Sequence, residues 1–245
     1  IGKDGIIVID TLVSAKEAKK FIKDIKTISN KPIKYVINTH NHLDHTFGNS
    51  EFKKLGAVII SQVKDAEKIK KESEAVLKNA KTYGLTEKDM KGTKIVYPEL
   101  TLTDGMEIYL GSRKVEIIYT GSSHTDGSIM AYLPDKKVLF AGDILFTDYH
   151  PFMGEGDIEG WLKALDYIMT MDVEKIIPGH GPISSKKDIE DMRNYLVAFD
   201  KKAKELAAGS DNAEHIASEI KKFLPPRPEG AGLILWNIQM KYLKK

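Results

Sequence analysis

The sequence predicts a layered α/β protein, and three observations lead to this prediction. Over residues 5–61, short apolar runs alternate with amphipathic stretches in the order strand, helix, strand, helix, strand. Over residues 93–141 the apolar residues recur with a period of two, which is typical of short neighbouring strands. Helical periodicity returns near residue 158 and dominates the rest of the chain. Strands that alternate with helices and are then flanked by further helices are typical of a layered α/β protein.

The first part of the chain carries the signals of a β-α-β-α-β unit. Its opening run GIIVID is short and rich in β-branched residues, which favours a buried strand. Ser14 and Glu17 have the spacing of a capping box, and the helical stripe that follows them ends at Asn30. Residues 64–83 keep a helical stripe among dense charges, which fits either a solvated helix or an insertion that walls a pocket. The other expected elements are a strand at Ile33–Asn38, a short helix that ends near Leu55 and a strand at Ala57–Ser61.

A β-meander and then mostly helices are expected after residue 93. Turn signals such as Asp104-Gly105 and Gly111-Ser112 separate the short strands. The expected strands are Leu100–Leu102, Met106–Leu110, Lys114–Tyr119, Ser128–Leu133 and Val138–Ala141. The later elements are helices at Ile158–Met169, Ser184–Ala208, just before Pro225 and at Leu233–Leu243, with a strand at Lys175–Ile177.

The composition excludes several classes of function. The chain has 245 residues, with 37 Lys and Arg against 35 Asp and Glu, so its formal charge is only +2. This balance, together with the scarcity of Arg, argues against a nucleic-acid partner. The chain has no Cys, which excludes disulfides, a Cys nucleophile and thiolate-held metal sites. Any metal must therefore be held by His and carboxylate side chains.

No apolar run approaches the roughly 20 residues of a membrane span, so we expect no membrane-spanning segment. No leader is visible, and the chain opens on Ile1 instead of Met. We therefore expect a cytoplasmic protein whose amino terminus has been processed or trimmed. The sequence makes no prediction of the oligomeric state.

Potential metal ligands are concentrated in four short windows, each expected in a turn after a strand. The first window, His40-Asn41-His42-Leu43-Asp44-His45, holds four His and Asp side chains within six residues. The other windows contribute His124, Asp143 and His180. A lone His or Asp in such a place is more often an ordinary core or turn residue. The group as a whole predicts a metal site, because imidazole nitrogen and carboxylate oxygen both bind zinc at about 2.0–2.2 Å.

In this order, the motif His40-x-His42-x-Asp44-His45 followed by His124, Asp143 and His180 resembles the metallo-β-lactamase fold superfamily. The resemblance covers nearly the whole chain and implies a four-layer αββα sandwich with the metal site at one edge of two sheets. We therefore expect one domain over residues 1–245. Members of the family usually have one or more strands before the segment matching Ile6–Asp10, so the first strand or strands are expected to be missing at the amino terminus.

The resemblance also implies a ligand set for two divalent metal ions. His40, His42 and His124 would hold the first ion, and Asp143 would bridge the two. The ligands of the second ion would be Asp44, His45 and His180. The metal is expected to be zinc, with iron or manganese as alternatives.

The function implied by this site is that of a dinuclear metal-dependent hydrolase. A hydroxide shared by two metals about 3.5–4 Å apart attacks a carbonyl or phosphoryl centre without a Ser or Cys nucleophile. Asp44 is expected to orient this hydroxide as the catalytic residue. Asp10, Thr39 and Asn41 are candidates to hold the imidazoles, although each fits a capping role equally well.

The expected substrate is a small ester, thioester or lactone. Asp143 stands where the thiolate-using β-lactamases have Cys, so the chain resembles the branch of hydroxyacylglutathione hydrolases and lactonases. Phe146 stands where some lactonases have Tyr, which weakens the match to them. The aromatic segment FTDYHPFM follows Asp143 directly, and we expect Phe146, Tyr149 and His150 to contact the substrate.

Four alternatives remain open at this point. β-Lactam hydrolysis is allowed by the motif, although Asp143 argues against it as the main activity. A phosphodiesterase or nuclease is disfavoured by the near-neutral charge. A persulfide dioxygenase with a single iron shares part of the motif. A binding module that has lost its metals is disfavoured because every expected ligand is of a competent residue type.

Overall fold

The computed structural model describes residues 1–243, which form two compact units. The first unit comprises Ile1–Tyr119 and Ile129–Lys136. The second comprises Thr120–Ser128 and the chain from Lys137 onward. The potential metal ligands are thereby divided, with the window at residues 40–45 in the first unit and His124, Asp143 and His180 in the second.

A four-stranded parallel sheet organises the first unit. Its strands are β1 (Ile6–Ile9), β2 (Ile33–Ile37), β3 (Val58–Gln62) and β4 (Leu100–Leu102), in that order across the sheet. The first three were predicted, and their apolar runs are buried as parallel strands require. The expectation for Leu100–Leu102 was wrong in one respect. These residues pair with β3 and not with the meander, and the Glu99 amide just before them donates to the Ile59 carbonyl at 2.8 Å.

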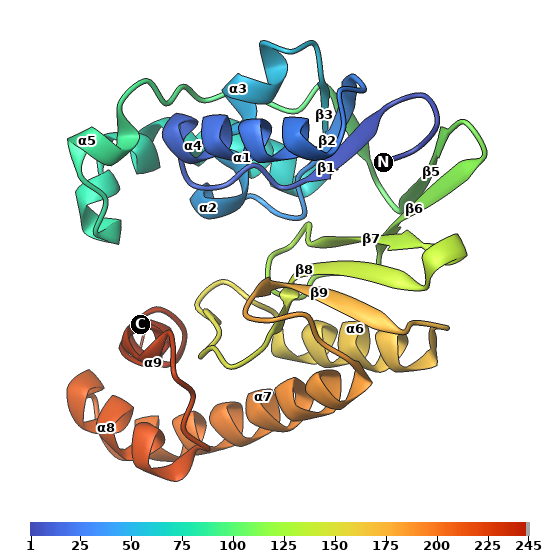
Figure 1. Cartoon of the computed structure of the whole chain (residues 1–245). Helices are drawn as coiled ribbons and strands as arrows, with labels where there is room; N and C mark the ends of the chain where they lie inside the picture. The colour runs from blue at the N-terminus through green and yellow to red at the C-terminus, as the bar shows by residue number, and fades with distance from the viewer. Residues whose placement is uncertain (244–245) are drawn as a thin grey trace. The chain divides into compact units, whose positions relative to one another are not determined.

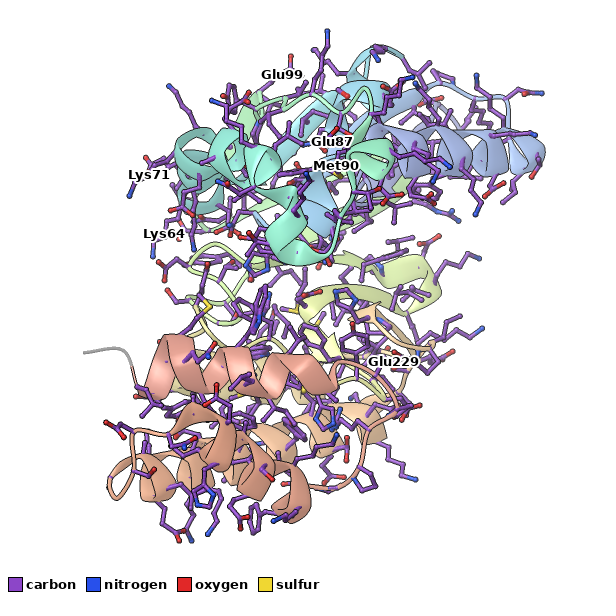
Figure 2. The ribbon with its side chains drawn as sticks, turned by 90° about the vertical axis from the view of Figure 1, so that its left-hand side faces the viewer. Lys64, Lys71, Glu87, Met90, Glu99 and Glu229 are labelled. Atoms are coloured by element: carbon purple, nitrogen blue, oxygen red, sulfur yellow. The ribbon has the colours of Figure 1, made fainter. Side chains whose placement is uncertain are left out.

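Helices cover this sheet. The helices of the unit are α1 (Ala15–Ile28), α2 (Leu43–Thr46), α3 (Asn49–Lys53), α4 (Val63–Lys78), the 3₁₀ turn Ala80–Tyr83 and α5 (Glu87–Met90). Figure 1 shows α1 and α3 beside β1 to β3, where Ala18, Ile22 and Phe52 pack on the strands. Met90, labelled on α5 in Figure 2, packs with Phe47 and Ala80 in a smaller core.

The first unit also contains three antiparallel strands, which confirm the central part of the predicted meander. They are β5 (Gly105–Leu110), β6 (Arg113–Tyr119) and β7 (Ile129–Leu133). Gly111 has a φ of 67° at the turn between the first two, a conformation that glycine adopts without strain. The 3₁₀ turn Pro134–Lys136 follows β7.

Two parallel strands carry candidate ligands in the second unit. They are β8 (Val138–Phe146) and β9 (Lys175–His180). Asp143 and His180 were expected in turns, and this was wrong, because both lie inside these longer strands. The strands keep pairing up to Phe146 and His180, with irregular register on both sides of Gly142. Such an irregularity changes the direction of the side chains next to it while β8 continues.

The remaining elements of the second unit are helices. They are α6 (Ile158–Thr170), α7 (Lys186–Ala207), α8 (Ala213–Phe223), α9 (Ala231–Asn237) and the π-helical turn Ile238–Tyr242. Figure 1 shows α6 next to β9 and α7 next to α6. The helix expected at Leu233–Leu243 is thus divided into an α-helical part and a π-helical part.

The strands belong to two sheets, one of β1 to β4 and one of β5 to β9, and helices flank them. This confirms the predicted α/β class. Within residues 1–243, no helix has both the length and the apolar character needed to cross a bilayer.

Candidate functional site

The loop that follows β2 carries the candidate ligands of the first unit, and a buried network of amide side chains holds the base of this loop. The Asn38 and Asn49 side chains bond each other in both directions, at 3.0 and 2.8 Å. Thr11 donates its hydroxyl to Asn49 at 2.9 Å. The Thr11 hydroxyl and amide also both donate to the His45 carbonyl. The end of the loop is therefore tied to the segment after β1.

The imidazoles of this loop lie close to one another. His40 Nε2 lies 3.0 Å from His42 Nδ1. The rings of His40 and His45 are tilted with centroids 4.1 Å apart. Asp44 Oδ2 lies 3.4 Å from His45 Nε2, and the Asp44 side chain is 38% exposed. The loop therefore presents three imidazole nitrogens and a carboxylate oxygen close together.

Asp10, at the end of β1, orients this group from behind. Its carboxylate accepts a hydrogen bond from His45 Nδ1 at 2.8 Å. It also accepts from the Thr39 amide at 2.7 Å and the Thr39 hydroxyl at 2.8 Å. Because His45 Nδ1 carries the proton, Nε2 is left with its lone pair, which is the form that binds a metal. The contact expected of Asp10 is thus present.

Thr39 and Asn41, the two other residues expected to hold an imidazole, differ in their contacts. The Thr39 hydroxyl lies 3.1 Å from His40 Nδ1 and can hold that ring as expected. The Asn41 amide oxygen is buried and has no hydrogen-bond partner among residues 1–243. The Asn41 amide oxygen therefore accepts no hydrogen bond from an imidazole in this part of the chain.

In the second unit, two imidazoles converge on one carboxylate oxygen. Asp143 Oδ2 lies 3.4 Å from His124 Nε2 and 3.5 Å from His180 Nε2. Asp143 is 4% exposed, and His124 is completely buried. Burying a carboxylate among nitrogens in this way is costly unless the charge is compensated, which a bound cation does.

The backbone beside His180 leaves just enough room for this carboxylate. A Cβ atom on Gly179 would lie 1.8 Å from Asp143 Oδ1 and 2.9 Å from the Asp143 amide nitrogen. Neither contact is sterically tolerable, so β9 can approach Asp143 only with glycine at this position.

Aromatic side chains fix the two histidines of this unit. The His124 ring meets Trp161 edge to face at a centroid distance of 5.1 Å, and the Trp161 indole N–H donates to the Ile144 carbonyl at 2.9 Å. The His180 ring is stacked on Phe146 at 5.1 Å with an interplanar angle of 11°. The Tyr149 ring also lies 5.1 Å from His180.

The three residues expected to contact the substrate have different surroundings. Phe146 is 2% exposed and His150 is 3% exposed, whereas Tyr149 is only partly buried. His150 Nδ1 lies 2.7 Å from the Tyr195 hydroxyl. Burial lowers the pKa of His150 and raises that of Tyr195, so the tyrosine donates its proton to a neutral imidazole.

The spacing of the donor atoms around Asp143 fits a divalent metal ion. Two ligand atoms on a tetrahedral zinc ion, each about 2.1 Å from it, lie about 3.4 Å apart. The distances around Asp143 Oδ2, 3.4 and 3.5 Å, agree with this spacing. Imidazoles and carboxylates suit zinc, iron and manganese alike.

Sequence reasoning missed Gly179 and Trp161 as parts of the site. Gly179 lay inside the window Pro178-Gly179-His180-Gly181, but a glycine in a turn has many roles. Trp161 lies on α6, outside every motif, and only the fold brings it to His124. No signal in a single sequence distinguishes this Trp from another core residue.

Comparisons with known proteins agree with this arrangement. A sequence model described as "Metallo-beta-lactamase superfamily" matches residues 1–180. Among solved structures, a metallo-beta-lactamase from Pontibacter korlensis is similar with a TM-score of 0.67 and 20% identity. The similarity covers 80% of this chain and 84% of that one. At this identity it supports the fold alone.

Two curated relatives carry names of different hydrolases. The linear primary-alkylsulfatase of Pseudomonas sp. (strain ATCC 19151) is 25% identical over 227 residues, covering 77% of this chain and 42% of that protein. The acyl-coenzyme A thioesterase MBLAC2 of Bos taurus is 28% identical over 154 residues, covering 59% of this chain and 54% of that protein. The chain thus spans about half the length of these curated relatives.

Proposed function

Since this chain belongs to the metallo-β-lactamase superfamily, whose members are generally metal-dependent hydrolases, we propose that it hydrolyses a small ester, thioester or lactone. The observation that carries the proposal is the pair of imidazoles on Asp143, with His124 and His180 at 3.4 and 3.5 Å from one buried oxygen. Such a group has little structural use without a cation to neutralise it.

The proposed ligand set joins the candidates of both units. His40, His42 and His124 would hold one ion. Asp44, His45 and His180 would hold the second, and Asp143 would be shared by both. The family match and the order of these residues along the chain support the set. The two ions are proposed to be zinc, with iron or manganese as alternatives.

Bound divalent ions supply Lewis acidity and lower the pKa of a bound water molecule toward neutrality. The chain's own residues then have separate tasks. Asp44, the more exposed carboxylate, accepts a hydrogen bond from the attacking water and orients it. Asp10 keeps the His45 proton on Nδ1, and Trp161 and Phe146 hold the rings of His124 and His180.

The proposed substrate class depends on the segment after β8. Tyr149 is only partly buried and its ring lies against His180, so this ring offers an apolar face beside a proposed ligand. Such a face suits the hydrocarbon part of an acyl group. The relative named as an acyl-coenzyme A thioesterase supports a thioester, and the one named as an alkylsulfatase supports a hydrocarbon-bearing substrate. Phe146 and His150 remain proposed substrate contacts.

The test is a substrate panel on the metal-loaded protein after chelation and reconstitution with zinc, iron or manganese. The panel holds p-nitrophenyl esters, acyl thioesters, lactones, alkyl sulfates, β-lactams and bis-p-nitrophenyl phosphate. We expect the ester, thioester or lactone group to give the highest kcat/KM. A clear preference for β-lactams, sulfates or phosphodiesters would overturn the proposed substrate class.

Metal analysis of the same preparation tests the ligand set. Two equivalents per chain are expected. A single iron would indicate the oxygenase alternative, and no metal after reconstitution would contradict the whole proposal.

A further inference from the structure

We propose that residues 225–242 form a strap that positions the loop after β8, and that Arg227 is the positioning residue for Tyr149. These residues lie beyond the family match, which ends at residue 180. The effect of the strap on substrate selection rests on the proposed function. The contacts by which the strap holds the loop do not depend on that proposed function.

The loop in question, residues 147–156, connects β8 to the coil before α6. It contains Asp148, which has a φ of 58° and therefore lies in the left-handed region that non-glycine residues rarely occupy. It also carries Tyr149, whose ring contacts both Phe146 and His180. A loop without regular structure needs contacts from elsewhere to keep such a backbone and such a ring in one place.

Arg227 provides the first of these contacts. Its Nη1 donates to the carbonyl oxygens of Phe146 and Tyr149, at 3.3 and 3.2 Å. Its guanidinium lies over the Tyr195 ring at 4.4 Å from the centroid, and its Nη2 pairs with Asp191. The side chain is only 5% exposed. One buried side chain thus joins both ends of the turn around Asp148 to α7.

Only arginine can make these contacts together. Its planar guanidinium presents several donors in fixed directions and stacks on an aromatic face. A lysine ammonium at the same position is a point charge and lacks the second donor group. Lysine would therefore have to choose between the loop carbonyls and Asp191.

The backbone of the strap adds a second contact. The His150 amide donates to the Glu229 carbonyl at 2.9 Å, and Tyr149 and Glu229 form an isolated parallel bridge. Figure 2 labels Glu229 in the coil that leads to α9. The next residue, Gly230, has a φ of 76°, and a Cβ there would lie 2.5 Å from the Tyr149 ring. The strap therefore lies directly against Tyr149.

Asn237, at the end of α9, provides the third contact. Its amide nitrogen donates to the Pro151 carbonyl at 2.9 Å, and its amide oxygen accepts from the Met153 amide at 2.6 Å. Asn237 is 1% exposed, so these bonds do not compete with water. The loop is held on both sides of His150 by residues of the same segment.

It follows that the position of the Tyr149 ring beside His180 depends on Arg227. Without the guanidinium, two loop carbonyls lose their donor, and the Asp148 turn loses the contact that fixes its ends. The acyl-facing surface offered by Tyr149 then becomes less defined, which weakens binding of the hydrocarbon part of a substrate more than it changes the chemistry at the carbonyl.

Hydrogen exchange on the metal-loaded protein tests the strap without any substrate. We expect Arg227→Lys and Arg227→Gln to accelerate exchange of the His150 amide by at least about tenfold, because the contact to Glu229 then opens locally. The amide of Trp161, bonded to Asp157, is expected to keep its rate. Arg193→Lys and Arg193→Gln are matched controls, because the partly buried Arg193 also pairs with an acid, Asp166, which lies on α6 and not in the loop. Unchanged exchange at His150 in both Arg227 variants would overturn the strap.

Kinetics on an acyl series test the effect on Tyr149. We expect Arg227→Lys to raise KM for long acyl chains by about tenfold with a much smaller change in kcat, and to affect short acyl chains little. In a Tyr149→Ala background, Arg227→Lys is expected to add no further loss, since both changes remove the same surface. Additive losses would show that Arg227 does not act through Tyr149. If the protein hydrolyses no ester, thioester or lactone, the proposed function fails while the exchange result still decides the strap.

Discussion

Gly179 and the carboxylate of Asp143 occupy adjoining space with no room for another atom, since a Cβ on residue 179 would stand 1.8 Å from Asp143 Oδ1. The close approach of β9 to β8 at this point brings His180 to 3.5 Å from the same carboxylate. A residue with no side chain is therefore a condition for placing two of the candidate ligands.

Gly179→Ala is expected to displace the Asp143 carboxylate and to lower metal content and turnover together, by about tenfold or more. The matched control is Gly209→Ala, where the nearest atom to a new Cβ is 3.9 Å away. Metal analysis, turnover and circular dichroism of both variants check this. Wild-type metal affinity in Gly179→Ala would mean that Asp143 is not a ligand.

Asp143→Ala is expected to abolish most metal binding while leaving the fold largely intact, because it removes the carboxylate oxygen that lies within 3.5 Å of His124 Nε2 and His180 Nε2. Calorimetric titration with zinc measures the loss directly. Asp211→Ala serves as the control, since Asp211 is an exposed acid of the same unit. Full activity in Asp143→Ala would remove Asp143 from the mechanism.

Asp10→Asn is expected to weaken metal binding by about 10–100-fold, the usual effect of losing a partner that orients a ligating imidazole. The amide keeps the shape of the carboxylate but cannot hold the His45 proton on Nδ1 as firmly, and it can present a donor there. Competition with a chromophoric chelator measures the affinity. Asp4→Asn, at an exposed position of the same unit, controls for the change in charge. Equal affinities of the two variants would contradict the role of Asp10.

The stability of the protein should depend on the protonation of His150. Burial lowers the pKa of this residue from its usual value of 6.5, and the positive charges of Arg227 and Lys221 lower it further. The unfolded chain therefore binds a proton where the folded chain does not, so stability falls as the pH falls below about 6.5. Urea unfolding at pH 7.5 and 5.5 measures the difference.

His150→Asn is expected to reduce this loss of stability on acidification, because no proton is then taken up at residue 150 on unfolding. His215→Asn is the control, since His215 lies exposed on α8. The assignment is wrong if the two variants show the same dependence on pH as the wild type.

The sequence predicted the parallel unit of β1 to β3 well, because each strand is a short β-branched run between clear end signals. The capping side chain of Ser14 indeed accepts from the Glu17 amide, at 3.3 Å. It predicted β4 in the wrong sheet because a strand of three residues has too little pattern to specify its partner. The predicted ends of β8 and β9 lie too early in the chain for a similar reason. Gly142 and Pro178 are residue types typical of turns, but in the structure they pair with each other where the register of the two strands is irregular.

The candidate ligands could be identified in the sequence because four of them stand within six residues. Their supporting contacts were readable only in part. Asp10 follows a strand directly and was a natural candidate. Arg227 lies 78 residues from Tyr149, and a single sequence holds no information that links the two.

Asp10 has a φ of 58°, although it is not a glycine. Replacing such a residue by glycine removes the steric strain of the left-handed conformation. Here the same change would remove the acceptor that fixes the His45 proton. Selection of this protein for heat resistance alone could therefore favour a substitution that leaves the candidate ligand His45 without the contact that orients it. Any selection at position 10 has to measure metal retention as well.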